Sequence, residues 1–536
     1  MNGWNIGTKQ SQLAELTPEL TDVGLYPQVN SEGGFNFVEI EGVSGSGTSF
    51  AVDVSTKTGT DTEKIQSALD DGGVIIINKK DALNTPWDIT ASLEIGSDTT
   101  WIINDCELKL ADNVDAPILV NSDIVSGNEN THVIGWGSAR LNCNGGNQNR
   151  LLNDHHNVGI HYYLVDNFSF KDIIIEETAK WGLVTEACNN GYLNNITFDN
   201  SGVVNQDGIH IIGPSSDIVC DGVFGTFGDD ACVCNGRDNP YQGYSTTGGD
   251  VERVIFNNVN IMGNGDGSRT GILRTSAGVV NSVKNVTLSN AIGRNISQGA
   301  LRLGGGDTSD HRTHRNIIAD NVILVSTNAA LPDYPAAFMT VIQGVGRVKL
   351  NNCVMLADTG NVDPVFVDNN DTLIVGLEVS NCSMEVPISQ GGQAFKFKNA
   401  AAKDILVNNF TLLCEDTTTG APTFNLCALA DNALINAVFS NVNMENVGNA
   451  IQATGTVTPT NVRFENINMR NCDPFFDVVS SNGYVVGGFA TESNNAETPT
   501  ASKYQIGDTV SFTDTGDGSG DGTYIKNSDT TFIKIL

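Results

Sequence analysis

The sequence feature that most constrains the fold is a short motif that recurs along most of the chain. Each copy has an Asn or Asp just before an apolar pair, as in FKDIII, LNNITF and FENINM. Successive copies are 23 to 37 residues apart, and the residues between them show short β-branched alternations rather than a helical period. The copies centre on these residues: Asp172, Asn195, Asp221, Asn258, Asn285, Asn321, Asn352, Asn381, Asn409, Asn441 and Asn466.

A repeat of this length predicts a solenoid. One such unit is too small to bury an apolar face alone, so neighbouring units must stack at a spacing of about 4.8 Å. Aliphatic side chains would then fill the inside, and asparagines would form ladders at the turns. We therefore predict an all-β chain that folds as a right-handed parallel β-helix of at least eleven coils. The long steps after Asp221 and after Asn285 predict two protruding loops.

The two ends of the chain differ from the repeat. Residues 60–73 have a helix start followed by apolar residues at Ile65, Ala68 and Leu69, which predicts a helix that caps the first coil. The last residues are turn-rich and predict a small β-module. The expected domains are an N-terminal attachment segment (1–50), the β-helix with the candidate catalytic residues (51–485), and a linker with the C-terminal module (486–536).

Charge and composition exclude several classes of partner. The chain has 29 basic and 62 acidic residues, a net charge of −33, which disfavours nucleic acid and anionic membranes. It has no apolar run long enough to enter a membrane, and its first residues show no secretory signal, so work outside a cell implies another route, such as assembly into a virion. Eleven scattered cysteines predict buried thiols, with no structural metal and no cofactor.

Three carboxylates stand out in the stretch NQDGIHIIGPSSDIVCDGVFGTFGDDACV. Asp207 precedes Asp229 and Asp230 by about one coil, so the three residues should be neighbours on adjacent coils. Mutual repulsion should raise the pKa of at least one of them, and hydrolysis of a glycosidic bond needs one protonated and one ionised carboxyl. The alternatives are that they are solvated turn residues or that they hold a calcium ion, but the one-coil spacing favours a catalytic role.

The same stretch resembles a known family. NQDGIHI followed by GDDACV is similar to the Asn-Thr-Asp and Asp-Asp motifs of glycoside hydrolase family 28, the polygalacturonases, within the pectate-lyase-like β-helix superfamily. The segments 133–148 and 168–184 extend the resemblance, which covers roughly residues 50 to 325. The resemblance implies that Asp229 is the general acid, that Asp207 and Asp230 activate the attacking water, and that the reaction inverts the anomeric centre.

The substrate-binding motifs of that family are altered. Asp266 stands where the family has its histidine, and ALRLGG retains Arg302 of the Arg-Ile-Lys motif but replaces the lysine with Gly304; Arg274 is a weaker alternative cation. Residues 266–315 hold seven Lys or Arg against three Asp, which suggests an anionic sugar. The candidate substrate-binding residues are Arg302, Arg274, Arg269, His210, Asp266, Tyr244 and Trp181.

Each of these candidates also has a simpler explanation. The role of a single arginine here could be only to neutralise nearby aspartates. A single aromatic residue more often fills a core or a loop than binds a sugar. Strict strand alternation places His210 on the face opposite Asp207, which argues against a role for His210 in the site.

The C-terminal module resembles small repeats of bacteriophage tail proteins. The resemblance implies a tailspike, homotrimeric and attached to a virion tail, that degrades an acidic surface polysaccharide. Two alternatives stay open at this point. One is a polysaccharide lyase on the same fold that uses Arg302 and a calcium ion held by Asp229 and Asp230, and the other is a tail fibre that binds a glycan without cutting it.

Overall fold

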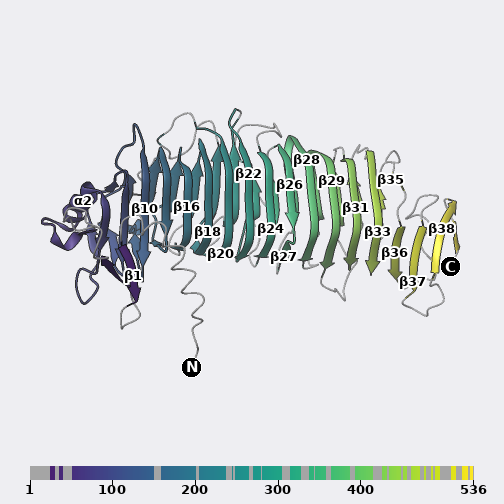
Figure 1. Ribbon diagram of the computed structural model, residues 1–536. Coiled ribbons are helices and arrows are strands. Elements are labelled where there is room, and N and C mark those ends of the chain that lie inside the picture. The colour runs from purple at the N-terminus through teal and green to yellow at the C-terminus, as the bar shows by residue number, and fades with distance from the viewer. Residues whose placement is uncertain are drawn as a thin grey trace, which may run out of the picture.

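The protein is an elongated stack of coils in the computed structural model (Figure 1). The structure describes the following residues: 25–29, 35–39, 51–149, 158–200, 205–236, 244, 248–264, 270–278, 280–304, 314–326, 337–342, 344–357, 364–386, 393–414, 425–430, 434–447, 451–454, 460–470, 476–478, 485–486, 489–494, 509–514, 522–528 and 531–534.

Three faces of parallel strands run along the stack. The first face comprises β6 (Leu93–Ile95), β9 (Leu119–Asn121), β12 (Ile160–Tyr163), β15 (Leu183–Glu186), β17 (Ile209–Ile212), β19 (Cys232–Gly236), β21 (Gly271–Ala277), β23 (Gly299–Leu303), β25 (Met339–Val341), β30 (Asn425–Ala430), β32 (Ile451–Thr454) and β34 (Phe476–Val478). The second comprises β3 (Ala51–Asp53), β4 (Gly73–Ile77), β7 (Thr99–Asn104), β10 (Asn128–Trp136), β13 (Val165–Lys171), β26 (Val345–Asn351) and β35 (Val485–Val486). The third comprises β5 (Trp87–Ile89), β8 (Glu107–Leu110), β11 (Arg140–Asn142), β14 (Ile174–Glu176), β27 (Val354–Ala357) and β36 (Phe489–Asn494).

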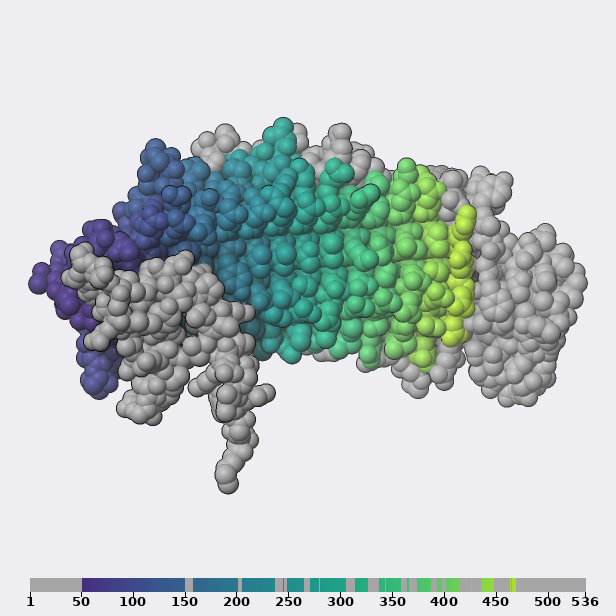
Figure 2. Space-filling view, in the orientation of Figure 1, coloured from purple at the N-terminus to yellow at the C-terminus, as the bar shows by residue number. Residues whose placement is uncertain are grey.

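Longer strands bend from the second face into the third. They are β16 (Asn189–Asp199), β18 (Ser215–Phe227), β20 (Val251–Gly263), β22 (Val283–Arg294), β24 (His314–Ser326), β31 (Leu434–Glu445), β33 (Thr460–Arg470), β28 (Val365–Val386) and β29 (Gln393–Cys414). Two of them, β28 and β29, also pair with strands of the first face. Each coil pairs in parallel with the coil before it and the coil after it, so the chain is a right-handed parallel β-helix, as the repeat predicts. Figure 2 shows the same order on the surface, where the colour changes steadily along the long axis.

Asparagine ladders hold the bends between the second and third faces. Asn195, Asn258 and Asn321 have left-handed backbone conformations, with φ angles of 54°, 53° and 56°. Asn tolerates this region better than most residues, because its short polar side chain can bond locally. The Asn321 amide donates to Asn290 Oδ1 on the preceding coil at 2.7 Å, and the Asn409 amide donates to Asn381 at 2.8 Å. The predicted ladder of turn asparagines is therefore present.

One predicted anchor belongs to a different ladder. Lys284 pairs with Glu252 and Ser289 pairs with Asn257, so Asn290, rather than Asn285, occupies the position of Asn258. The step from Asn290 to Asn321 is 31 residues, and the long step predicted after Asn285 is wrong. The error arose because left-handed asparagines occupy two different columns along the stack. The residues around each asparagine do not show in which of the two columns it lies. The sequence assigned to that second loop, apart from residues at its two ends, lies outside the described residues.

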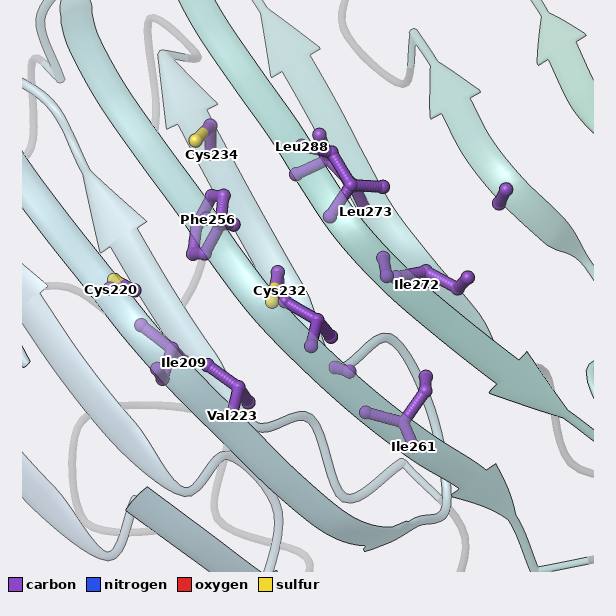
Figure 3. Close-up of a cluster of buried hydrophobic side chains, with 14 of the residues drawn as sticks. Ile209, Cys220, Val223, Cys232, Cys234, Phe256, Ile261, Ile272, Leu273 and Leu288 are labelled. Carbon is purple, nitrogen blue, oxygen red and sulfur yellow. The ribbon is translucent and has the colours of Figure 1, made fainter. Parts of the chain in front are cut away.

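The interior is a column of apolar side chains. On the first face, Leu183, Ile209, Cys232 and Leu273 occupy equivalent positions on successive coils and are fully buried. Figure 3 shows Ile209, Cys232 and Leu273 with Phe256 of the second face in the same packed region. The nine cysteines whose side chains the structure describes are buried and free, as expected of thiols. Aliphatic stacking therefore supplies the rigid scaffold on which outward side chains are displayed.

The capping helix that the sequence predicts is present at the N-terminal end. The helix α2 (Asp61–Asp71) begins at a capping box formed by Thr60 and Glu63 and buries Ile65, Ala68 and Leu69. It lies at the N-terminal end of the stack (Figure 1). Two short 3-10 turns are η1 (Val54–Thr56) and η2 (Gly145–Asn147). The strands of the two antiparallel parts are β1 (Leu25–Val29) with β2 (Phe35–Glu39), and β37 (Thr509–Asp514) with β38 (Gly522–Ser528) and β39 (Thr531–Lys534). Within the described residues, no helix is long and apolar enough to cross a membrane.

A buried histidine predicts acid-sensitive stability. His314, at the start of β24, is fully buried, and burial lowers its pKa to about 4. An unfolded chain binds this proton near the ordinary pKa of about 6.5, so the free energy of unfolding should decrease as the pH falls from about 6.5 towards 4. Thermal unfolding between pH 7 and pH 5 should show a fall in Tm for the natural chain and a smaller fall for His314→Gln. Equal falls for the two chains would contradict this assignment.

Candidate active site

The candidate site lies on the first face, where strand register places two kinds of side chain in separate columns. Along the strands β15 to β23, the inward column is the buried aliphatic one described above. The alternate positions form an outer column, in which His210 pairs with Val184 and Val233, Val233 pairs with Arg274, and Arg274 pairs with Arg302. Residues of five successive coils thus come into line, although they span 118 positions of sequence from Val184 to Arg302.

The aspartates lie at the edge where these strands begin. The Gly182 amide donates to the Asp207 carbonyl at 2.9 Å, and the Gly208 amide donates to the Asp230 carbonyl at 3.0 Å. The Ala231 amide continues the pattern by donating to the Gly271 carbonyl at 2.9 Å. Asp207, Asp230 and Gly271 therefore occupy equivalent positions on three successive coils, and Asp207 and Asp230 are direct neighbours across one strand pair, as their spacing predicts.

The carboxyl groups of Asp207 and Asp230 contact residues of the outer column. Asp207 Oδ2 lies 3.5 Å from His210 Nδ1, and Asp230 Oδ2 lies 3.6 Å from Arg274 Nη1. The expectation that His210 faces away from Asp207 is therefore wrong. Regular strand geometry begins only at Ile209, so the alternation that governs Ile209 and His210 does not extend back to Asp207.

The buried carboxyls have free hydrogen-bonding capacity. Asp207 and Asp230 are 2% and 0% exposed. No group among the described residues hydrogen-bonds to Asp207 Oδ1 or to either side-chain oxygen of Asp230, and the same holds for Arg274 Nε. Buried polar atoms in folded proteins almost always have partners, so this arrangement is suited to bind polar atoms from outside the protein chain.

Asp229 differs from its two neighbours because its side chain is partly exposed. Its Oδ1 accepts a hydrogen bond of 2.9 Å from the Asp230 amide. Burial and the charge of Asp230 raise the pKa of Asp229 to about 7, against the lowering effects of Arg274, the Asp230 amide and Arg302. Burial, Asp229 and Asp230 also raise the pKa of Asp207 well above its usual value. The three carboxyls therefore do not all carry charge together at neutral pH.

Two arginines flank the acids. Burial alone would lower the pKa of Arg274, but Asp230, Asp207 and Asp229 outweigh it and raise that pKa, so Arg274 stays a cation. Arg302 is its neighbour on the next coil, is 9% exposed, and donates from Nη1 to Gln298 Oε1. The site therefore combines acidic groups with two adjacent guanidinium groups.

Two other basic residues of the predicted positive segment, Lys284 and Arg294, have partners away from the site. On β22, Lys284 forms ion pairs with Asp250 and Glu252 at 3.2 Å and 3.3 Å, and Arg294 donates to Asn260 at 2.8 Å. The basic residues that follow one another in the sequence therefore lie on different faces of the β-helix, with Arg274 and Arg302 on the first face and Lys284 and Arg294 on β22. Arg269 and Asp266 lie outside the described residues.

Trp181 forms a wall of the site rather than an open platform. Its ring centroid lies 3.7 Å from that of His210, and it packs in a small outward apolar cluster with Val158, Val184 and Ile212. Burial, Arg274 and His161 together hold the pKa of His210 well below its usual value. His210 is therefore a neutral imidazole beside the Asp207 carboxyl, where it can donate or accept a single hydrogen bond.

A second cluster of polar and aromatic side chains lies on this face. Of its members, only Tyr244 was among the candidates predicted from the sequence. His161 Nε2 lies 3.1 Å from Glu186 Oε2, and both side chains are fully buried. The Tyr244 amide donates to the same Glu186 oxygen at 2.6 Å. The Tyr244 ring stacks on His161 at 4.5 Å and lies 5.3 Å from the Tyr163 ring. The strand IHYY shows no motif that would have indicated these contacts.

Solved structures of similar shape include two phage proteins and an enzyme. A family 28 exopolygalacturonase of Yersinia enterocolitica is 13% identical, with a TM-score of 0.45, and the match covers 83% of this chain and 82% of that chain. A tailspike protein of E. coli bacteriophage HK620, in complex with a hexasaccharide, is 13% identical with a TM-score of 0.46, over 89% of this chain and 84% of the tailspike. The pre-mature gene product 12 of bacteriophage phi29 is 13% identical with a TM-score of 0.47, and the match covers 84% of this chain and 60% of the phi29 chain.

Both kinds of protein that the motifs resemble, family 28 polygalacturonases and phage tailspikes, are thus among the similar structures. No family model and no curated protein matches the chain. Similarity at this level of identity does not bear on any residue or activity, so function must be argued from the site itself.

Proposed function

We propose that the chain hydrolyses glycosidic bonds of an acidic polysaccharide with a set of aspartates and with inversion. The observation that supports this proposal is the contrast within the trio. Asp229 is partly exposed and has a pKa near 7, whereas Asp207 and Asp230 are buried with oxygens that no described protein group binds. Inverting hydrolysis of a glycosidic bond uses a proton donor together with a carboxylate that activates a water molecule.

In the proposed reaction, Asp229 donates its proton to the glycosidic oxygen as the bond from that oxygen to the anomeric carbon breaks. A water molecule held by Asp207 and Asp230 attacks the same carbon from the opposite side and gives one proton to this pair of carboxyls. Arg274 Nη1 lies 3.6 Å from Asp230 Oδ2 and places a positive charge beside that carboxyl group. His210, 3.5 Å from Asp207, orients the Asp207 carboxyl.

The proposed substrate is anionic because Arg274 and Arg302 lie side by side next to the acids. A guanidinium group binds a carboxylate or a sulfate through two parallel hydrogen bonds. The chain as a whole carries −33 and repels a polyanion at long range, so a local cationic pair is what would hold an acidic sugar in place. Together with the resemblance of the C-terminal module to phage tail proteins, the proposal extends to a homotrimeric tailspike on a virion, with the catalytic β-helix at 51–485.

A panel of acidic polysaccharides tests the proposal. Incubation with the protein should release reducing ends without the ultraviolet absorbance of an unsaturated uronate. Reducing ends with that absorbance would instead identify a lyase, and binding without either signal would identify a glycan-binding fibre. Inversion is checked by following the anomeric configuration of the first product by NMR.

The activity should decline on the alkaline side of neutrality. The proposed acid Asp229 must be protonated to act, and its pKa is about 7. kcat/KM should therefore fall tenfold for each pH unit well above about 7. The measurement is a pH profile of kcat/KM with a substrate of constant charge in that range, and activity that stays level up to pH 9 would contradict the assignment of the acid.

A further inference from the structure

We propose that Tyr163 and Tyr244 form a second carbohydrate subsite, an aromatic platform that binds a sugar ring of the same polysaccharide several units away from the cleaved bond. This inference rests on the proposed function, since it concerns the path of the same substrate. The platform is defined by the two tyrosine rings and by the His161 and Glu186 side chains beneath them.

The platform is in line with the aspartates. His161 pairs with Val184, and Val184 pairs with His210, so the platform continues the outer column of the first face towards the N-terminus. β12 is two coils from β17 and three from β19, which corresponds to about 10 Å from the coil of Asp207 and about 14 Å from that of Asp230. A polysaccharide lying along the stack would cover both places with a short run of sugar units.

The pose of Tyr244 is set in advance by buried contacts. Tyr244 follows β19 in the chain, yet its amide donates to Glu186, 58 positions earlier. Its ring lies on the His161 ring at an angle of 27°. Glu186 and His161 are both fully buried and bonded to each other. A ring held in this way loses little conformational entropy when a ligand binds.

The exposure of the four side chains indicates a ligand rather than only a loop anchor. His161 and Glu186 are fully buried, whereas Tyr163 and Tyr244 are both partly exposed. Tyrosine combines an apolar ring face with a hydroxyl group, which matches the C–H face and the hydroxyls of a sugar. Burial and Glu186 raise the pKa of Tyr163, so its hydroxyl stays protonated and can donate a hydrogen bond.

Binding to oligosaccharides of defined length tests the platform. The probes are size-separated fragments, from disaccharide to octasaccharide, of the acidic polysaccharide that binds best in the panel. In the Asp229→Asn background, which is expected to prevent cleavage, Tyr163→Ala and Tyr244→Ala should each weaken binding of the long fragments about tenfold and leave the short ones unchanged. Tyr244→Phe, which keeps the ring, should bind long fragments nearly as well as the parent.

Tyr192 supplies a matched control. It is a tyrosine on β16 of the second face with 42% exposure, so Tyr192→Ala should bind every fragment as the parent does. Unchanged affinity of both platform variants for long fragments would overturn the inference and leave Tyr244 as a loop anchor. Length-dependent loss of affinity in a protein that cuts none of the panel would support the platform while refuting the proposed hydrolysis.

Discussion

Replacing Asp229 with Asn should lower kcat by at least about a hundredfold and leave polysaccharide binding intact. The expected effect is large because Asp229 is the partly exposed member of the trio and has the pKa of about 7 that a proton donor needs at neutral pH. An amide of the same shape keeps the hydrogen bond from the Asp230 amide but has no acidic proton to transfer to the glycosidic oxygen. Reducing-end release and calorimetric binding on the same preparation separate the two effects.

The same variant carries a built-in check on folding. A carboxyl whose folded pKa is raised from about 3.9 to about 7 destabilises the folded chain progressively as the pH rises through that interval. Asp229→Asn removes this cost, so its Tm should exceed that of the natural chain at pH 8 and approach it at pH 4. Asp199→Asn, an exposed aspartate at the end of β16, is the control and should leave activity unchanged. Full activity of Asp229→Asn would show that the proton comes from another group.

Replacing Gly271 with Ala should reduce kcat/KM by about a hundredfold, although Gly271 has no functional group. A Cβ atom at this position would lie 2.4 Å from Asp230 Oδ1, so the buried carboxyl would have to move. Displacement of a catalytic group by about 1 Å is enough for a loss of this size. The backbone at Gly271 is not in the left-handed region, so the substitution adds no conformational strain of its own.

Gly146→Ala is the matched control for this experiment. No atom lies within 4 Å of a Cβ built there, and activity and Tm should match the natural chain. Steady-state kinetics should then show a loss of activity in Gly271→Ala alone, and a crystal structure of the variant should show a rotated Asp230 side chain. Natural activity in Gly271→Ala would mean that the position of the Asp230 carboxyl does not limit the reaction.

Several parts of the site could be predicted because they depend only on the coil period. Asp207 and Asp230 are 23 residues apart, and a coil of this length returns the chain to the neighbouring strand. The capping helix could likewise be read from Thr60, Glu63 and the apolar spacing after them, since these signals are local. Even within the period, the position of Asn285 was predicted wrongly, because left-handed asparagines occur in two columns of the stack.

Other parts of the site could not be predicted because they depend on how strands begin and where loops return. The turn before Ile209 brings the Asp207 carboxyl to the same side as His210, against strict alternation. Of the basic residues in one segment, Arg274 faces the aspartates, whereas Lys284 pairs with Asp250 on another face. Sequence distance and charge counts contain no information about this division.

By itself, the sequence determined a stacked β-helix with a capped end and a set of aspartates one coil apart, because apolar alternation and turn asparagines act over short distances and repeat. Only the packing of the coils showed which side chains share the outer column and which carboxyl groups are buried. It also decided that Tyr244 returns 58 positions to Glu186. The physical reason is that burial and electrostatic coupling depend on the packing of distant coils and loops, which no local pattern encodes.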